Sequence, residues 1–423
     1  MRVTMAVSTS SAERTFSRNG GVPSPVVAGY LLLAAGVSGL AGLSMLLQQI
    51  GLLPDDLAQA IARFHPAAML LLVGVPAFLG GFGRLFLRQD LIGASSSANR
   101  LVKPFDVVAL GLIALSLPIF LAASGTVAPL GVVVWCAGAA LLAATTLGVV
   151  LDSHAGPGVV APRGDDHPVV LAPFSIFVWT QLLAACGLLF VAPVLAASAT
   201  RALINGGQAI VSFAPPLTLI VLVAAFGMAA RLFEALAPTT DRARHLAVAV
   251  SAIAGLGGPV LWAQANLAHV SQAVTVTESN VLAAMASIVF TFIWVSALWR
   301  RKVALGAQSG VPVLWASGFF VLLAAGWAGQ GVHMAVLNGA AFVLFGALYG
   351  WIDARTEGRY PARLAQIQFA LMFFGVVLAG GNDVMKTLGG GLMVASLIML
   401  AAVLLGTMRN AVSARVTSQE IGR

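Results

Sequence analysis

Long runs of apolar residues, each about twenty residues in length, follow one another along almost the whole sequence. An α-helix of about 20 apolar residues is long enough to cross the hydrocarbon core of a bilayer. Hydrophobic residues make up 59% of the chain and charged residues only 9%, whereas about a quarter of the residues of a soluble domain are charged. The chain is therefore predicted to be an all-α polytopic membrane protein, and a water-soluble fold is excluded.

Twelve such runs predict a bundle of twelve transmembrane helices. They form one membrane domain over residues 25–408, between an N-terminal tail, 1–24, and a C-terminal tail, 409–423. Residues 152–169 are rich in Gly, Pro and Asp, which predicts an exposed loop. The predicted spans lie near residues 25–50, 64–87, 105–123, 129–151, 170–198, 206–232, 244–268, 279–299, 311–330, 332–351, 363–382 and 388–408.

The basic residues are distributed unevenly between the two sides of this topology. With the N-terminus in the cytoplasm, twenty of the 23 Lys and Arg residues fall on the cytoplasmic side, and only Arg63, Arg201 and Lys386 fall on the other. Cytoplasmic loops of membrane proteins carry such an excess. We therefore expect both termini to be cytoplasmic, in an inner (plasma) membrane whose lipid surrounds the chain. The formal charge of +8 is then an orientation signal, and nucleic acid is not expected as a partner.

Two of the six histidines stand apart from the others. His65 and His333 each open a long apolar run on the non-cytoplasmic side, at about the same depth in the membrane. An ionisable group at such a position is costly and usually faces the bundle interior, and neutral imidazole is a common ligand of iron. The pair could therefore hold a haem iron from both faces. The alternative is that each ring caps a helix end or hydrogen-bonds to a neighbouring backbone.

The run that begins at His65 also contains Pro76-Ala77 and Gly80-Gly81-Phe82-Gly83. In order and spacing it resembles the second transmembrane helix of subunit I of the haem-copper oxidases, the family of cytochrome c oxidase subunit I. Other segments resemble, in the same order, the next loop and the fifth, tenth and eleventh helices of that family: Leu91 to Ala94, Phe174 to Trp179, Pro193 to Ala196, His333 to Trp351 and Ile367 to Gly375.

The resemblance implies a twelve-helix fold in which His65 and His333 are the axial ligands of one low-spin haem. The catalytic centre of the family has no counterpart here. Its copper and high-spin haem ligands would fall on Pro215, Gln264, Ala265 and Gly331, and its acid, tyrosine and proton-path lysine on Leu217, Leu219 and Phe290. Apolar side chains cannot coordinate copper or iron, and a lone glutamine is a poor ligand. Copper and terminal oxidase activity are therefore not expected.

The haem type and its contacts also follow from the resemblance. The first-helix arginine that contacts the formyl group of haem a falls near Leu46-Leu47-Gln48-Gln49, which favours a b-type haem. The family's arginine pair for the propionates is missing as well. Lys386, together with Arg201, is the cation on the outer side that could pair with a propionate.

The leading functional hypothesis is a membrane cytochrome that relays single electrons near the outer face. A companion redox subunit, a periplasmic electron carrier or a quinone would be its partner. The alternative hypothesis is a haem-free structural or assembly subunit of a respiratory complex.

Overall fold

The computed structural model describes residues 23–91, 96–122, 128–155, 174–205, 212–234, 239–268, 272–299, 310–326, 331–356 and 358–421. The regular secondary structure of these residues is helical throughout. Most of the N-terminal tail, most of the predicted loop 152–169 and residues 92–94 of the family-like loop lie outside the described residues.

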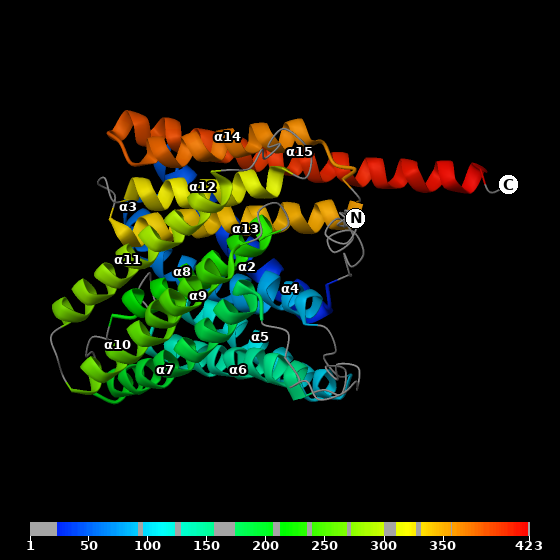
Figure 1. Cartoon of the computed structure of the whole chain (residues 1–423). Coiled ribbons are helices and arrows are strands. Elements are labelled where there is room, and N and C mark those ends of the chain that lie inside the picture. The colour runs from blue at the N-terminus through cyan, green and yellow to red at the C-terminus, as the bar shows by residue number, and fades with distance from the viewer. Residues whose placement is uncertain are drawn as a thin grey trace, which may run out of the picture.

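Most of the helices cross the whole bundle (Figure 1). The first half of the chain forms α2 (Pro25–Gln49), α3 (Asp55–Ala68), the π-helical turns η1 (Met69–Gly74) and η2 (Pro76–Gly81), α4 (Phe82–Asp90), α5 (Ser96–Ala122), α6 (Pro129–Ala155), α7 (Ile176–Ile204) and α8 (Ala214–Glu234). The second half forms α9 (Asp241–Ala252), the π-helical turn η4 (Ile253–Gly257), α10 (Gly258–Leu267), α11 (Gln272–Leu298), α12 (Val311–Ala325), α13 (Val332–Thr356), α14 (Ala362–Ala379) and α15 (Asp383–Ile421).

Among the described residues, 11 helical segments are long and apolar enough to cross a membrane. The elements from α3 to α4 join into one segment, Gln59–Asp90, and α9, η4 and α10 join into another, Asp241–Leu267. The prediction of a helical membrane protein with many spans is therefore confirmed. The remaining predicted run, near 311–330, corresponds to α12. This helix has 15 residues and is about 22 Å long, which is shorter than the hydrocarbon core of about 30 Å.

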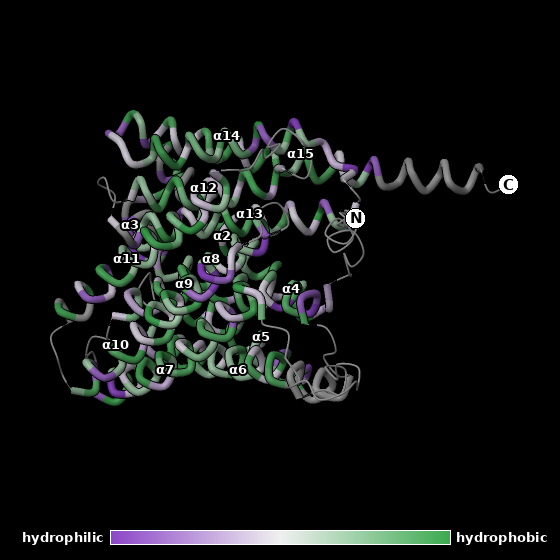
Figure 2. The backbone as a smooth tube through the Cα atoms, viewed as in Figure 1, coloured by the Kyte–Doolittle hydropathy of each residue, from purple (hydrophilic) through white to green (hydrophobic). Residues whose placement is uncertain are grey.

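α8 and the second span lie at the centre of the bundle, and α14 and α15 lie at the edge. The most apolar window of α8 is 94% buried, whereas the corresponding windows of α14 and α15 are each 22% buried. α14 and α15 form an antiparallel hairpin along one side of the bundle, and the C-terminal part of α15 continues beyond the other helices (Figure 1). Hydrophobic residues predominate along the helices (Figure 2). The chain therefore has a packed interior around α8 and a broad apolar exterior suited to lipid.

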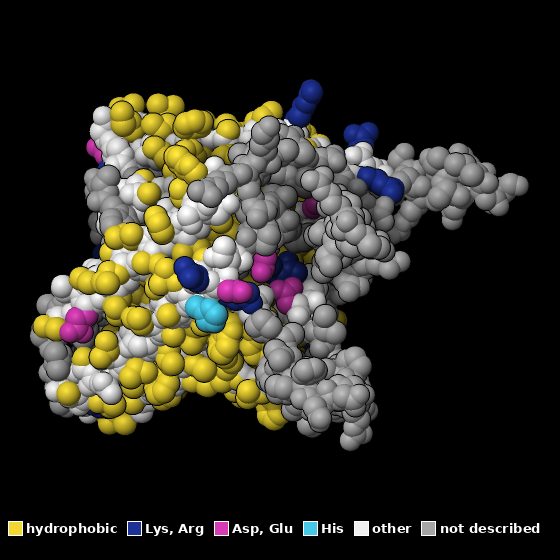
Figure 3. All heavy atoms as spheres, in the orientation of Figure 1, with side chains coloured by type: hydrophobic (Ala, Val, Ile, Leu, Met, Phe, Trp, Pro, Cys, Tyr) yellow, Lys and Arg dark blue, Asp and Glu magenta, His cyan; other side chains and the backbone are white. Residues whose placement is uncertain are grey.

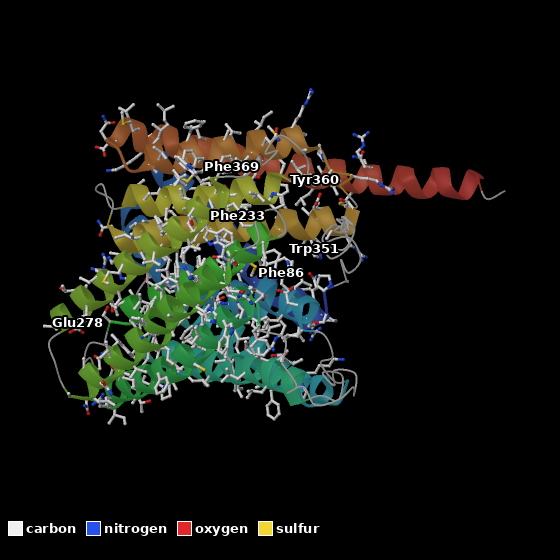
Figure 4. The ribbon with its side chains drawn as sticks, in the orientation of Figure 1. Phe86, Phe233, Glu278, Trp351, Tyr360 and Phe369 are labelled. Carbon is white, nitrogen blue, oxygen red and sulfur yellow. The ribbon has the colours of Figure 1, made fainter. Side chains whose placement is uncertain are left out.

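Aromatic rings fill the interior between α8, α11 and α12. The rings of Phe226 and Phe290 stack with centroids 3.6 Å apart, and the Trp294 ring lies 5.0 Å from that of Phe233. Phe320 of α12 contacts the same group, 5.9 Å from Phe233. Figure 4 shows Phe233 among the packed helices. Because ring pairs add about 0.5–1.5 kcal/mol beyond their buried area, this group holds the three helices together.

The Gly80-Gly81-Phe82-Gly83 segment allows α2 to pack closely against the second span. A Cβ atom at Gly80 would lie 2.6 Å from the ring of Tyr30, and one at Gly81 would lie 2.6 Å from Leu31. A Cβ atom at Gly83 would overlap the carbonyl oxygen of Phe78. The glycines therefore serve helix packing and the π-helical turn, since any larger residue would separate the helices.

Two local features differ from the structure that the apolar runs predict. The sequence predicts uninterrupted α-helices, but the second and seventh spans contain the π-helical turns η1, η2 and η4. The last helix continues through residues 410–421, in a region that the sequence assigns to a tail. Apolar periodicity predicts which residues face the interior, but it does not predict the single extra residue of a π-helical turn.

Candidate functional site

His65 lies in the last turn of α3, just before the first π-helical turn of the second span. Its ring is half-buried, and its Nδ1 atom is fully buried with no hydrogen-bond partner. The preceding residue, Phe64, packs against Phe120 of α5 with ring centroids 5.5 Å apart. The backbone at His65 is therefore held in the bundle, while the ring nitrogen has nothing to bind within the described residues.

His333 is the second residue of α13 and is also half-buried. The helix begins after Gly331, whose φ of +81° lies in the left-handed region that favours glycine. His333 therefore falls in the first turn of the helix that begins directly after this glycine. Neither imidazole makes a hydrogen bond or ion pair with the rest of the described chain.

The two histidines lie at the same end of the bundle. The second span runs from α3 to α4, and α13 runs in the same direction from His333 to Thr356 (Figure 1). α13 also packs against η1, the turn that follows the His65 helix. His65 and His333 therefore lie near the starts of two neighbouring helical segments that run in the same direction.

The buried charges of the described residues, in contrast, are paired. Arg84 is 1% exposed, and its Nη2 lies 2.7 Å from the Oδ1 of Asp106 on α5. The same guanidinium donates hydrogen bonds to the Thr145 carbonyl at 2.9 Å and to the Thr145 hydroxyl at 2.7 Å. The hydroxyl of Tyr30 donates to the Asp106 backbone carbonyl at 3.3 Å. This group joins α2, α4, α5 and α6, so a polar contact inside the bundle ties four helices together.

A second ion pair lies at the same end of the bundle as Arg84. Arg231 of α8 donates to Asp90 Oδ1 and Gln89 Oε1, each at 2.9 Å. Its guanidinium also lies 4.2 Å from the centroid of the Phe86 ring, which Figure 4 labels. Figure 3 shows a group of charged side chains amid hydrophobic surface where α4, α8 and α9 lie. The charges at this end therefore interact with one another and leave His65 and His333 at the opposite end.

Lys386 lies near the start of α15, an exposed position at the same end as His65 and His333. Its ammonium is paired with Asp383 Oδ1 at 3.2 Å. No contact in the described chain joins it to either histidine. Beside it lies an apolar hollow of about 460 Å³, which is lined by Val384, Thr387, Leu388, Gly391 and Leu392.

These observations can be tested against the needs of a haem. Two axial ligands require two imidazoles free of other partners, and His65 and His333 meet that need within the described chain. The apolar hollow is lined by α15 alone, and neither His65 nor His333 lines it. Lys386 could turn from Asp383 to a propionate, since the pair is exposed. The donor set, two imidazoles without other partners in the described chain, is therefore of the kind that an iron takes.

The positions that match the family's catalytic ligands have other surroundings. Pro215, Leu217 and Leu219 are buried in α8, and Phe290 stacks on Phe226. Gln264 is exposed on α10, and Gly331 is exposed before α13. Among the described residues, no three His, Cys, Asp or Glu side chains form a group that could hold a metal ion.

Several important residues of this region could not be found from the sequence. Arg84 is counted there with the cytoplasmic cations, and Asp106 is not singled out, because their pairing depends on how α4 and α5 pack. Trp135 of α6 donates from its Nε1 atom to the Leu71 carbonyl oxygen at 2.7 Å, within η1. The proline at position 76, which leaves a backbone carbonyl without its donor, is the one sequence signal for such a contact.

No protein-family model matches the chain.

Proposed function

We propose that this chain is an integral membrane cytochrome that holds one low-spin, b-type haem between His65 and His333 and relays single electrons. The observation that carries the proposal is the contrast between the two kinds of ionisable residue. The buried charges Arg84 and Asp106 are paired, whereas within the described residues the Nδ1 atom of His65 is buried without a partner and His333 lies unpaired at the same end.

An unpaired polar atom inside a protein costs free energy, and a binding role is one explanation for its presence. His65 and His333 would each present one ring nitrogen to the iron, and Phe64 and Gly331 would help to place the two rings. Lys386 would pair with a propionate, for which it would leave Asp383. When bound, the haem supplies an iron that gains and loses one electron at a time.

The proposed chemistry is electron transfer without oxygen reduction. If the imidazoles of His65 and His333 both bound the iron, they would leave no open position where dioxygen could bind. The family's copper-ligand position on α8 is Pro215, and Leu217 and Leu219 beside it are equally apolar. The Phe226–Phe290 stack occupies the interior beside them. These residues support a relay role over that of a terminal oxidase.

The proposed topology has twelve spans, with both termini cytoplasmic, in an inner membrane. α12 would be the twelfth span, and its burial against α8 and α13 would compensate for its short length. This arrangement puts His65 and His333 near the outer face. A companion redox subunit, a periplasmic electron carrier or a quinone in the outer leaflet could then exchange electrons with the haem.

The test is the reduced-minus-oxidised absorption spectrum of the purified protein and of three variants. The wild type should show the bands of a low-spin b-type haem, and His65→Ala and His333→Ala should each abolish them. His245→Ala is the matched control, because His245 is exposed on α9 and its Nδ1 is paired with the Asp241 carbonyl. Bands that survive both substitutions, or a colourless wild type, would contradict the proposal.

A haem-free structural or assembly subunit is the second candidate. The tight contact between α12 and α13 favours it, because a Cβ atom at Gly339 would lie only 2.7 Å from Phe319. A bundle filled by its own side chains needs no cofactor to fold. A colourless, folded protein that purifies together with other respiratory subunits would support this candidate.

A further inference from the structure

The contact between Trp135 and Leu71 joins α6 to the helix that carries His65. Both residues are fully buried, and the indole Nε1 donates to the Leu71 carbonyl oxygen at 2.7 Å. In an α-helix the carbonyl of residue i accepts from the N–H group of residue i+4, which for Leu71 would be that of Val75.

The hydrogen-bond pattern of η1 explains why the carbonyl is free. In this turn the N–H group of Val75 donates to the Leu70 carbonyl, five residues earlier. The same pattern requires an N–H group at residue 76 for the carbonyl of Leu71. Residue 76 is Pro76, which has no N–H group. Trp135 supplies the missing donor, since a buried carbonyl without a partner is costly.

The π-helical turns also determine the relative directions in which side chains at the two ends of the second span point. A π-helical turn holds one residue more than an α-helical turn. It therefore changes the direction of the residues before it by roughly 100°, the angle that one residue takes in an α-helix. His65 lies before η1, and Arg84, fixed by Asp106 and Thr145, lies after η2. The direction of the His65 ring relative to Arg84 thus depends on whether these turns persist.

We propose that Trp135 is a positioning residue for His65: its hydrogen bond to the Leu71 carbonyl maintains the first π-helical turn of the second span and so fixes where the imidazole points. The inference rests on the proposed function, because the imidazole needs a fixed direction only if it binds an iron. Trp135 itself touches neither histidine in the described chain.

The test compares Trp135→Phe with Trp315→Phe in the full-length protein. Both tryptophans are fully buried, but the Nε1 of Trp315 has no hydrogen-bond partner, so only Trp135→Phe removes a hydrogen bond. We expect Trp135→Phe to cause a several-fold loss of bound haem and a shift in the g-values of the oxidised iron. These values depend on the angle between the two imidazole planes. Trp315→Phe should leave both unchanged. Wild-type haem content and g-values in Trp135→Phe would overturn the proposal.

A second pair of variants tests the contact without haem. Pro76→Ala supplies the N–H group that Leu71 lacks, so Trp135→Phe should lower the unfolding midpoint less in a Pro76→Ala background than in the wild type. An equal loss in both backgrounds would overturn the inferred role of the hydrogen bond. A wild type without haem would defeat the proposed function. Histidine-dependent haem that is insensitive to Trp135→Phe would defeat only the positioning role.

Discussion

At the scale of single residues, the ion pair between Arg84 and Asp106 and its hydrogen bonds join four helices, α2, α4, α5 and α6. The Arg84 guanidinium donates to the Asp106 carboxylate of α5 and to the hydroxyl and carbonyl oxygens of Thr145 of α6, so that three acceptors surround one cation. A charge inside a membrane domain is tolerated when its partners satisfy it. Removing one partner therefore costs more than removing both.

Arg84→Met should lower the free energy of unfolding by about 3–5 kcal/mol, because it leaves the Asp106 carboxylate buried and uncompensated. Arg84→Met combined with Asp106→Leu should recover most of this loss, since an apolar pair needs no compensation. Denaturant unfolding in detergent would measure both. Arg88→Met is the control, because Arg88 is exposed on the next turn. A double variant as unstable as Arg84→Met would contradict this explanation.

Gly80 offers a second test at this scale. Gly80→Ala would place a Cβ atom 2.6 Å from the Tyr30 ring, and overpacking of this kind costs about 1–3 kcal/mol. Gly36→Ala on α2 is the matched control, because an added Cβ atom there meets nothing within 4 Å. Thermal unfolding should show a lower midpoint for Gly80→Ala only. Equal midpoints would mean that α2 does not pack against the second span in this way.

At the scale of helices, polar contacts join the peripheral α14–α15 hairpin to the bundle. The Tyr349 hydroxyl of α13 donates to Gln368 Oε1 of α14 at 2.9 Å. The Ser396 hydroxyl of α15 donates to the Gln368 carbonyl at 2.8 Å. Three helices therefore meet at one buried glutamine. This point adds a polar contact to the packing of Phe369 against Trp315 and Phe342, whose ring centroids lie 5.2 and 5.9 Å away.

Tyr349→Phe should lower the free energy of unfolding by about 1–3 kcal/mol, since it leaves the Gln368 side-chain oxygen buried without a donor. Limited proteolysis should then release the α14–α15 hairpin faster than in the wild type. Ser317→Ala is the control, because the Ser317 hydroxyl bonds only within its own helix, to the Val313 carbonyl at 2.8 Å. A hairpin cleaved at the wild-type rate would show that apolar packing alone holds it.

Helix positions could largely be predicted from the sequence, because apolar length alone decides which segments can span a membrane. The predicted edge at residue 129, for example, is the first residue of α6. The π-helical turns could not be predicted from apolar periodicity, and the contact from Trp135 to the Leu71 carbonyl in η1 depends on how α6 packs. Only part of the polar interior could be predicted in the same way. The sequence singles out His65 and His333, but it does not reveal the Arg84–Asp106 pair, which forms only when α4 packs against α5.

At the scale of the whole molecule, topology is the property that gives the two ends different roles. The paired charges of Arg84 and Arg231 gather at one end, and the histidines lie at the other. In the proposed topology, which rests on the positive-inside bias of the sequence, the first end would face the cytoplasm. Any electron partner would then meet the chain from outside.

The topology can be tested with single cysteines in a background where Cys136 and Cys186 are replaced by serine. Leu52→Cys lies in the exposed turn between α2 and α3, on the proposed outer side, and should react in intact cells with a maleimide that cannot cross membranes. Arg409→Cys, near the end of the last span, should react only after the cells are opened. Labelling of both residues in intact cells would contradict the proposed orientation.

The most direct test of the central claim is the amount of haem in the purified full-length chain, measured by extraction into pyridine and compared with the protein concentration. The account predicts about one b-type haem per chain, and none in a His65→Ala, His333→Ala double variant that still folds. A folded wild-type chain without haem, or a double variant that retains it, would contradict the claim that these two histidines hold an iron between them.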